Sequence, residues 1–146
     1  MQFQKGYKSP HFVTNNADMN VVLPNPRVFL YDGILNVAKD LIPLLTGMSS
    51  ADQSVLIVAQ DIEGEALATL IVNKIRGNIK VCAVKAPDFG DRRTLFMEDI
   101  ATLTGGTVLS KDKGNRLSIM KMEELEPLLG SARTITINKD ETTIVE

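Results

Sequence analysis

The stretch VLIVAQDIEGEALATLIVNKIRGNIKVCAV, Val55 to Val84, decides the fold. It opens with a continuous apolar run, Val55 to Ala59, which is typical of a strand covered on both faces. A helical pattern over Glu63 to Arg76 follows, closed by Gly77, and a second apolar strand spans Ile79 to Val84. Strand, helix and strand in this order predict a right-handed crossover between parallel strands.

The alternation continues on the C-terminal side of this stretch. A helix is predicted over Asp91 to Leu103, because an acidic residue stands at its start and Gly105-Gly106 follow its end. Thr107 to Leu109 is a third, short strand. The sequence therefore predicts an α/β fold with a parallel βαβαβ core, flanking helices and β-hairpins.

The N-terminal side is less regular. Residues 1–26 are rich in Asn, Pro and Gly and are expected to form loops with one or two edge strands. Arg27 to Tyr31 is a strand candidate that the turn pair Asp32-Gly33 would end. The periodicity of Ile34 to Gly47 predicts a helix, with Asp40 as N-cap and Pro43 in the first turn.

The last third of the chain is expected to hold short elements. A turn is predicted at Lys111 to Asn115, followed by a short helix over Met122 to Leu129 that Gly130 stops. Ala132 to Asn138 and Thr142 to Val145 are predicted to pair as a hairpin.

Length and composition limit the functional classes. The 146 residues fit one compact domain, and 44% hydrophobic with 23% charged residues is typical of a soluble globular protein. A net charge of -2 argues against a nucleic-acid binder and against an electrostatic membrane anchor. Cys82 and His11 are the sole cysteine and histidine, so a Cys- or His-based metal site is not expected. The N-terminus does not resemble a secretory signal, so we do not expect secretion.

The predicted helix over Glu63 to Arg76 carries more apolar surface than one sheet can cover. On a helical wheel its apolar residues sweep roughly 240°, whereas packing on a sheet needs about 100° to 140°. The helix predicted over Ile34 to Leu45 has a weaker excess, near roughly 180°. Two readings remain open from periodicity: the helices bury the surplus against each other, or they leave an apolar groove for a segment of another chain.

Several long motifs resemble those of a known family. DIEGEALATLIVNKIRG (Asp61 to Gly77), KAPDFGDRR (Lys85 to Arg93), EDIATLTGGT (Glu98 to Thr107) and INKDETT (Ile137 to Thr143) are similar to segments of the apical domain of group I chaperonins of the GroEL type. The opening MQFQKGYKSPHF (Met1 to Phe12) is similar as well, so the resemblance covers essentially the whole chain.

This resemblance implies the swivelling β/β/α architecture of the apical domain, with residues 1–146 as one polypeptide-binding domain of a longer chain. It implies that non-native polypeptides, and the mobile loop of a GroES-type co-chaperonin, bind an apolar groove between two helices. By motif position the groove residues are Tyr7, His11, Phe12, Ile42, Leu45, Leu67, Ile71, Val72 and Asn73.

The family also sets expectations about the parent protein. Its members form homo-oligomeric rings and bind ATP and magnesium in an equatorial domain, which these residues lack, so the fragment itself is expected to hold no cofactor and to be no enzyme. No phosphate-binding G-x-x-x-x-G-K-[ST] loop is present in the sequence. The isolated domain is expected to be a monomer, from a bacterial cytoplasm or the matrix or stroma of an organelle.

Three positions depart from the family pattern. His11 stands where a tyrosine is usual, which makes the groove locally more polar. Asp88 replaces a glycine whose backbone is expected to need a positive φ. Gln60 stands where an acidic residue is common, which puts one inter-subunit charge contact in doubt.

Two alternatives to the chaperonin family fit parts of the sequence. A magnesium-dependent phosphoryl-transfer fold of the Toprim kind would use Asp61 and Glu63 as ligands, but no Asp-x-Asp pair follows the strand Ile79 to Val84. A purely structural interaction module, with both helices fully packed, is a further alternative.

A cluster of basic residues allows two interpretations. Lys85, Arg92 and Arg93 form either an anion site or, as we favour from the sequence, solvated or inter-subunit salt bridges.

Overall fold

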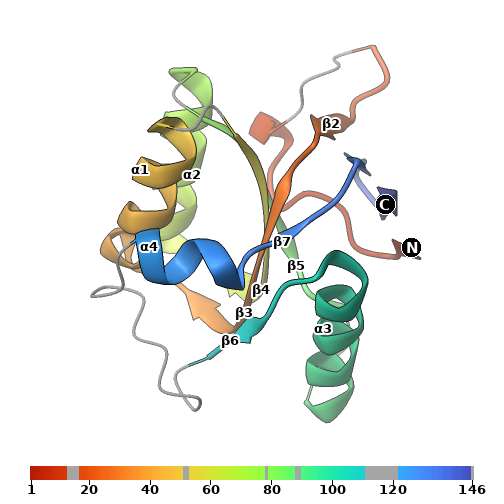
Figure 1. Cartoon of the computed structure of the whole chain (residues 1–146). Helices are drawn as coiled ribbons and strands as arrows, with labels where there is room; N and C mark the ends of the chain where they lie inside the picture. The colour runs from red at the N-terminus through yellow and green to blue at the C-terminus, as the bar shows by residue number, and fades with distance from the viewer. Residues whose placement is uncertain (13–16, 51–52, 78, 88–89, 111–121, 146) are drawn as a thin grey trace.

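The computed structural model describes residues 1–12, 17–50, 53–77, 79–87, 90–110 and 122–145. Two sheets form the centre of the molecule (Figure 1). In the parallel sheet the order is β5 (Lys80–Lys85), β4 (Ser54–Ile62), β3 (Arg27–Leu35) and β6 (Val108–Leu109), and β7 (Gly130–Ser131) pairs antiparallel with β3. The antiparallel sheet has the order β1 (Gln2–Phe3), β9 (Thr142–Val145), β8 (Thr134–Ile137) and β2 (Val21–Pro24).

The strand order decides which face each helix covers. The chain moves from β3 to β4 to β5 in one direction, so right-handed crossovers place α1 (Ile42–Ser50) and α2 (Gly64–Ile75) on the same face. It then returns across the sheet to β6, and α3 (Asp91–Thr104) therefore lies on the opposite side (Figure 1). The mixed α/β class and the parallel βαβαβ core are confirmed.

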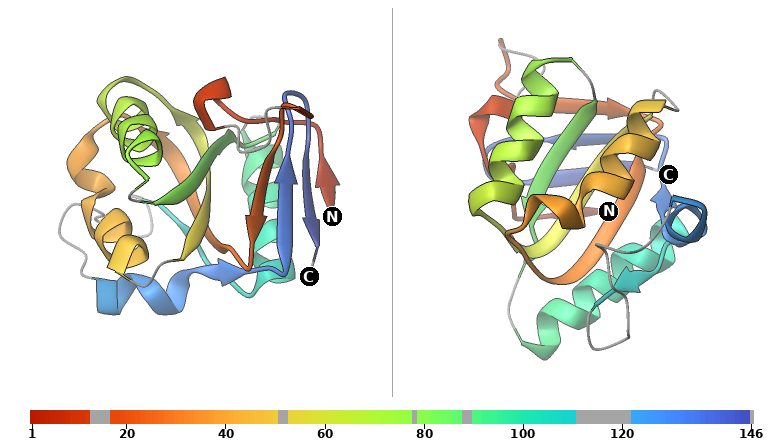
Figure 2. Two further views of the ribbon diagram at one scale, coloured as in Figure 1. Left: turned by 90° about the horizontal axis from the view of Figure 1, so that it is seen from above. Right: turned by 90° about the vertical axis from the view of Figure 1, so that its left-hand side faces the viewer.

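The parallel sheet is buried on both faces. Helices α1 and α2 cover one face, and the antiparallel sheet with α3 lies on the other side (Figure 2). All residues from Val55 to Ala59 are fully buried, which explains why this strand is apolar without interruption. The antiparallel strands instead alternate, as in β8, where Ile135 and Ile137 point into the core.

The helices that follow β4 and β5 begin and end close to where the sequence predicts. Gly77 and Gly105 stand just beyond α2 and α3 with φ of 75° each, the left-handed conformation that glycine adopts at helix ends. Thr107 to Leu109 and the C-terminal hairpin are also confirmed, as β6 and as the antiparallel pair β8–β9. The turn predicted at Lys111 to Asn115 lies outside the described residues.

The turn predicted at Asp32-Gly33 is wrong, because β3 continues to Leu35. Its register against β4 shifts between Tyr31 and Ile34, so one additional residue of β3 is accommodated as a bulge. A Cβ on Gly33 would lie 2.7 Å from the ring of Tyr31, so glycine serves a close contact at this bulge.

The helix predicted over Ile34 to Gly47 is wrong at both ends. A 3₁₀ turn, η2 (Ala38–Asp40), precedes α1, and the first helical hydrogen bond runs from Leu45 N to Leu41 O, so Asp40 is not the N-cap. Pro43 does lie in the first turn. The helix passes through Gly47 because Met48, buried beside Leu44, adds another core contact one turn later.

The helix predicted over Met122 to Leu129 is split. It consists of α4 (Met122–Leu125) and a 3₁₀ turn, η5 (Glu126–Leu128), and Gly130 already belongs to β7. A Cβ on Gly130 would lie 2.2 Å from Oγ1 of Thr104, so this backbone packs directly against the end of α3.

Candidate functional site

One side of α2 changes gradually from buried to exposed while remaining apolar. Ala66 and Leu70 are fully buried under the helix, and Leu67 and Ile71 are half-buried against the core. Further round, Val72 is 43% exposed and Ile75 is 64% exposed. We call Leu67, Ile71, Val72 and Ile75 the α2 stripe. Its outer half, Val72 and Ile75, stays substantially exposed to solvent.

Helix α1 lies beside α2 on the same face of the sheet (Figure 2). Ile42 is 54% exposed, whereas Leu45 is only 8% exposed and packs inward. Thr46 and Ser49, which follow Ile42 on the outer side, are exposed polar residues. Within α1 the exposed apolar side chain is therefore Ile42; Ile34 and Val37, which the predicted helix included, are also exposed but precede α1.

The N-terminal segment also reaches α2. A 3₁₀ turn, η1 (Pro10–Phe12), packs against α2 and β5. Phe12 is completely buried, so its ring supports α2 from within and offers no surface to a ligand. His11 is exposed, and half-buried Tyr7 donates its hydroxyl to the carbonyl oxygen of Met19 at 3.2 Å.

Asn73 lies on the half-buried side of α2. Its side-chain amide donates to the carbonyl oxygen of Thr69 at 2.8 Å, so it bonds back to its own helix. The nine residues expected at the groove thus differ in exposure. They are exposed (His11, Ile42 and Val72), half-buried (Tyr7, Leu67, Ile71 and Asn73) or buried (Phe12 and Leu45). Ile75 was missing from that set, although the helical wheel already placed it within the apolar arc.

The carboxylate of Asp61 stands at the end of β4. It accepts a hydrogen bond from Lys8 Nζ at 2.7 Å and another from the amide of Ile62 at 2.8 Å. Burial alone would raise the pKa of this carboxyl, but those two bonds and the charges of Lys8 and Lys85 outweigh it and lower the pKa. Asp61 is therefore occupied by an internal ion pair, and Glu63 is an exposed residue at the N-cap position of α2.

The basic cluster divides in a similar way. Arg93 Nε lies 3.1 Å from Oδ1 of Asp32, so part of its charge is matched within the chain. Arg92 and Lys85 are exposed, and Gln60 is half-buried near the end of β4. The backbone expected at Asp88 lies outside the described residues.

Comparison with protein-family models found no model that matches this chain. Among the described residues, no helix is long and apolar enough to cross a membrane. In the same residues no group of three or more His, Cys, Asp and Glu side chains gathers in a metal-binding arrangement.

Proposed function

We propose that this chain is an apical-type domain of a group I chaperonin and holds non-native polypeptides against the α2 stripe. Two things support the proposal: the similarity of Asp61 to Gly77 to the family's motif, and the exposure of Val72 and Ile75 on that same helix. The single observation that carries it is that α2 remains apolar beyond the arc its own sheet covers.

An apolar stripe suits a partner whose sequence is not fixed. Apolar burial is non-directional and contributes about 25 cal/mol per Å², so any segment with exposed apolar side chains gains from the contact. Much of that gain is offset by ordering the bound segment, so one domain is expected to bind at about micromolar affinity or weaker. Several copies held together would bind far more tightly through avidity.

The remaining elements of the proposal follow from the family. The parent protein would be a homo-oligomeric ring of the bacterial cytoplasm or of an organelle's matrix or stroma. A GroES-type co-chaperonin loop would compete for the stripe, and ATP with magnesium would act in a separate domain. The apical-domain architecture is itself part of this proposal. The observed arrangement of two sheets is compatible with it.

The test uses a fluorescently labelled polypeptide kept unfolded by carboxymethylation of its cysteines. Val72→Glu and Ile75→Glu place a charge on the exposed half of the stripe, so we expect each to weaken binding at least about tenfold. Because both side chains already contact water, the thermal midpoint should change little. Leu95→Glu is the matched control, since Leu95 is 65% exposed on α3, on the other side of the sheet.

Equal binding by all three variants would contradict the proposal. Leu67→Glu and Ile71→Glu should also abolish capture. Both side chains pack against the core, however, so we expect these two variants to lower the thermal midpoint as well. For this reason the test of the proposal relies on Val72→Glu and Ile75→Glu.

A further inference from the structure

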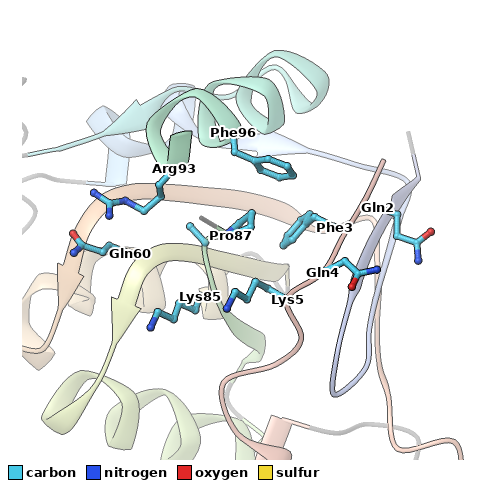
Figure 3. A pocket seen from close by; sticks show the side chains of 10 residues that line it. Gln2, Phe3, Gln4, Lys5, Gln60, Lys85, Pro87, Arg93 and Phe96 are labelled. Carbon is cyan, nitrogen blue, oxygen red and sulfur yellow. The ribbon is translucent and has the colours of Figure 1, made fainter. Parts of the chain in front are cut away.

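A cavity of about 740 Å³ lies on the other side of the molecule from α1 and α2 (Figure 3). It is bounded by the N-terminal strand β1 and the residues after it, the end of β4, Ala86 and Pro87 after β5, and the first turns of α3. Its polar lining consists of the side-chain amides of three glutamines and of three cations, Lys5, Lys85 and Arg93. Two aromatic rings, Phe3 and Phe96, also line it. The volume is in the range of sites that bind small organic ligands.

The charged side chains that line this cavity in the described part of the chain all carry positive charge. No acidic residue is among the described residues that line it. Two carboxylates next to lining residues have partners: Asp32 accepts from Arg93 and Thr94, and Asp61, which follows Gln60, is bridged to Lys8. The charged side chains of the described lining are therefore cationic, and Lys5 and Lys85 are the exposed ones among them.

Glu141 is a third neighbouring acid, outside the lining. It directly precedes β9 and accepts a hydrogen bond from the side-chain amide of Gln2, an uncharged donor that itself lines the cavity. Lys5 and Lys85 are exposed, and no ion pair within 4 Å joins either to a carboxylate of the described residues. Figure 3 shows both lysines on one side of the cavity, with Arg93 and Phe96 of α3 on the other.

The wall between the cations is aromatic. The rings of Phe3 and Phe96 meet edge to face, with centroids 5.5 Å apart and an interplanar angle of 74°. Phe3 is buried in the core, whereas Phe96 is half-buried and borders the cavity. An apolar or aromatic body can therefore pack on Phe96 while an anionic group meets the lysines.

We propose that this cavity binds a small organic anion, in which a phosphate or carboxylate group pairs with Lys5 and Lys85 and an aromatic body packs against Phe96. This site is separate from the α2 stripe and does not depend on it. The sequence favoured solvated or inter-subunit salt bridges for Lys85, Arg92 and Arg93. The structure gives Arg93 an internal partner, but it leaves Lys85 at the mouth of a cavity.

The proposal is tested by titrating the chain with phenyl phosphate and following backbone amide resonances. We expect shifts concentrated at Phe3, Lys85 and Phe96, and weaker binding of inorganic phosphate and of phenol, which each supply one half of the ligand. Lys85→Gln should weaken phenyl phosphate binding by roughly threefold to fivefold, because an exposed charge pair contributes modestly. Lys39→Gln, at an exposed lysine of η2, is the matched control and should bind as the parent chain does.

Added salt should weaken the interaction, since the lysines are exposed to solvent. The proposal is overturned if phenyl phosphate shifts no resonance of the lining, or if Lys85→Gln and Lys39→Gln weaken binding equally. Inorganic phosphate binding as tightly as phenyl phosphate would overturn the role of Phe96. None of these results bears on capture of unfolded polypeptides, so the two proposals fail independently.

Discussion

The ammonium of Lys8 lies 2.7 Å from Oδ1 of Asp61 and joins the N-terminal segment to the carboxyl end of β4. Both side chains are mostly buried, at 28% and 21% exposure. The amide of Lys8 also donates to the carbonyl oxygen of Ala83 in β5 at 2.8 Å. The segment that leads to η1 and α2 is therefore held by a backbone bond and an ion pair together.

The first prediction concerns acid stability. Asp61 has a folded-state pKa below its ordinary value of 3.8, so its contribution is present above about pH 4 and is lost as the pH falls through the folded pKa. Asp61→Asn should lower the free energy of unfolding by about 1 kcal/mol at pH 7. The difference from the parent chain should shrink progressively as the pH is lowered through the folded-state pKa, as measured by urea denaturation over a series of acid pH values.

Asp99→Asn, at an exposed carboxylate of α3, provides the comparison and should change stability by less than about 0.5 kcal/mol at pH 7. A deficit for Asp61→Asn that stays constant from neutral to acid pH would mean that the ion pair is not its cause.

The second prediction concerns Arg27, whose guanidinium binds the segment between α4 and β7. It donates to the carbonyl oxygens of Glu126, Leu129 and Gly130 at 2.9 to 3.1 Å, and it pairs with the Glu126 carboxylate at 2.6 Å. Arg27→Ala would remove this donor from all three carbonyl oxygens; the contacts to Leu129 and Gly130 are part-buried, whereas Glu126 O keeps a hydrogen bond from the amide of Leu129. We therefore expect a loss of about 2 to 4 kcal/mol in urea denaturation.

Glu126→Gln removes only the ion pair, on a side chain that is 53% exposed. It should therefore cost less than about 1 kcal/mol. Equal losses in Arg27→Ala and Glu126→Gln would show that the ion pair, and not the set of carbonyl contacts, stabilises this segment.

The third prediction concerns the thiol of Cys82, which lies in β5 and is completely buried. Burial raises the pKa of this thiol far above its usual range, with a smaller opposing influence from Lys74. A thiol reagent at mildly alkaline pH should therefore label the folded chain only as fast as the sheet opens, and label it rapidly in urea. Fast labelling without denaturant would place Cys82 at the surface and contradict the position of β5.

Local sequence signals were sufficient where one segment determines its own environment. The uninterrupted run Val55 to Ala59 predicts a strand buried on both faces, and the glycines after α2 and α3 mark helix ends whatever surrounds them. The hairpin β8–β9 could also be predicted from the sequence, because its turn and its two strands follow one another directly in the chain.

Distant partners decided the places where prediction failed. Asp32-Gly33 has turn propensity, but pairing of Ile34 and Leu35 with the end of β4 keeps the chain extended. The burial of Phe12 likewise depends on α2 lying above it, which no pattern near residue 12 reveals. Phe3 and Phe96 are far apart in the sequence, so no local pattern predicts their contact. The cavity that they border could not be predicted for the same reason.

The pairing of β1 with β9 brings the two ends of the chain to one spot. Met1 and Ile144 exchange backbone hydrogen bonds at 2.8 and 2.6 Å, so the first and last strands are direct neighbours. This unit could therefore be inserted into a host protein between two backbone positions about 5 Å apart, the spacing of adjacent strands. The same geometry suits circular permutation, because a short linker would close the ends without stretching either sheet.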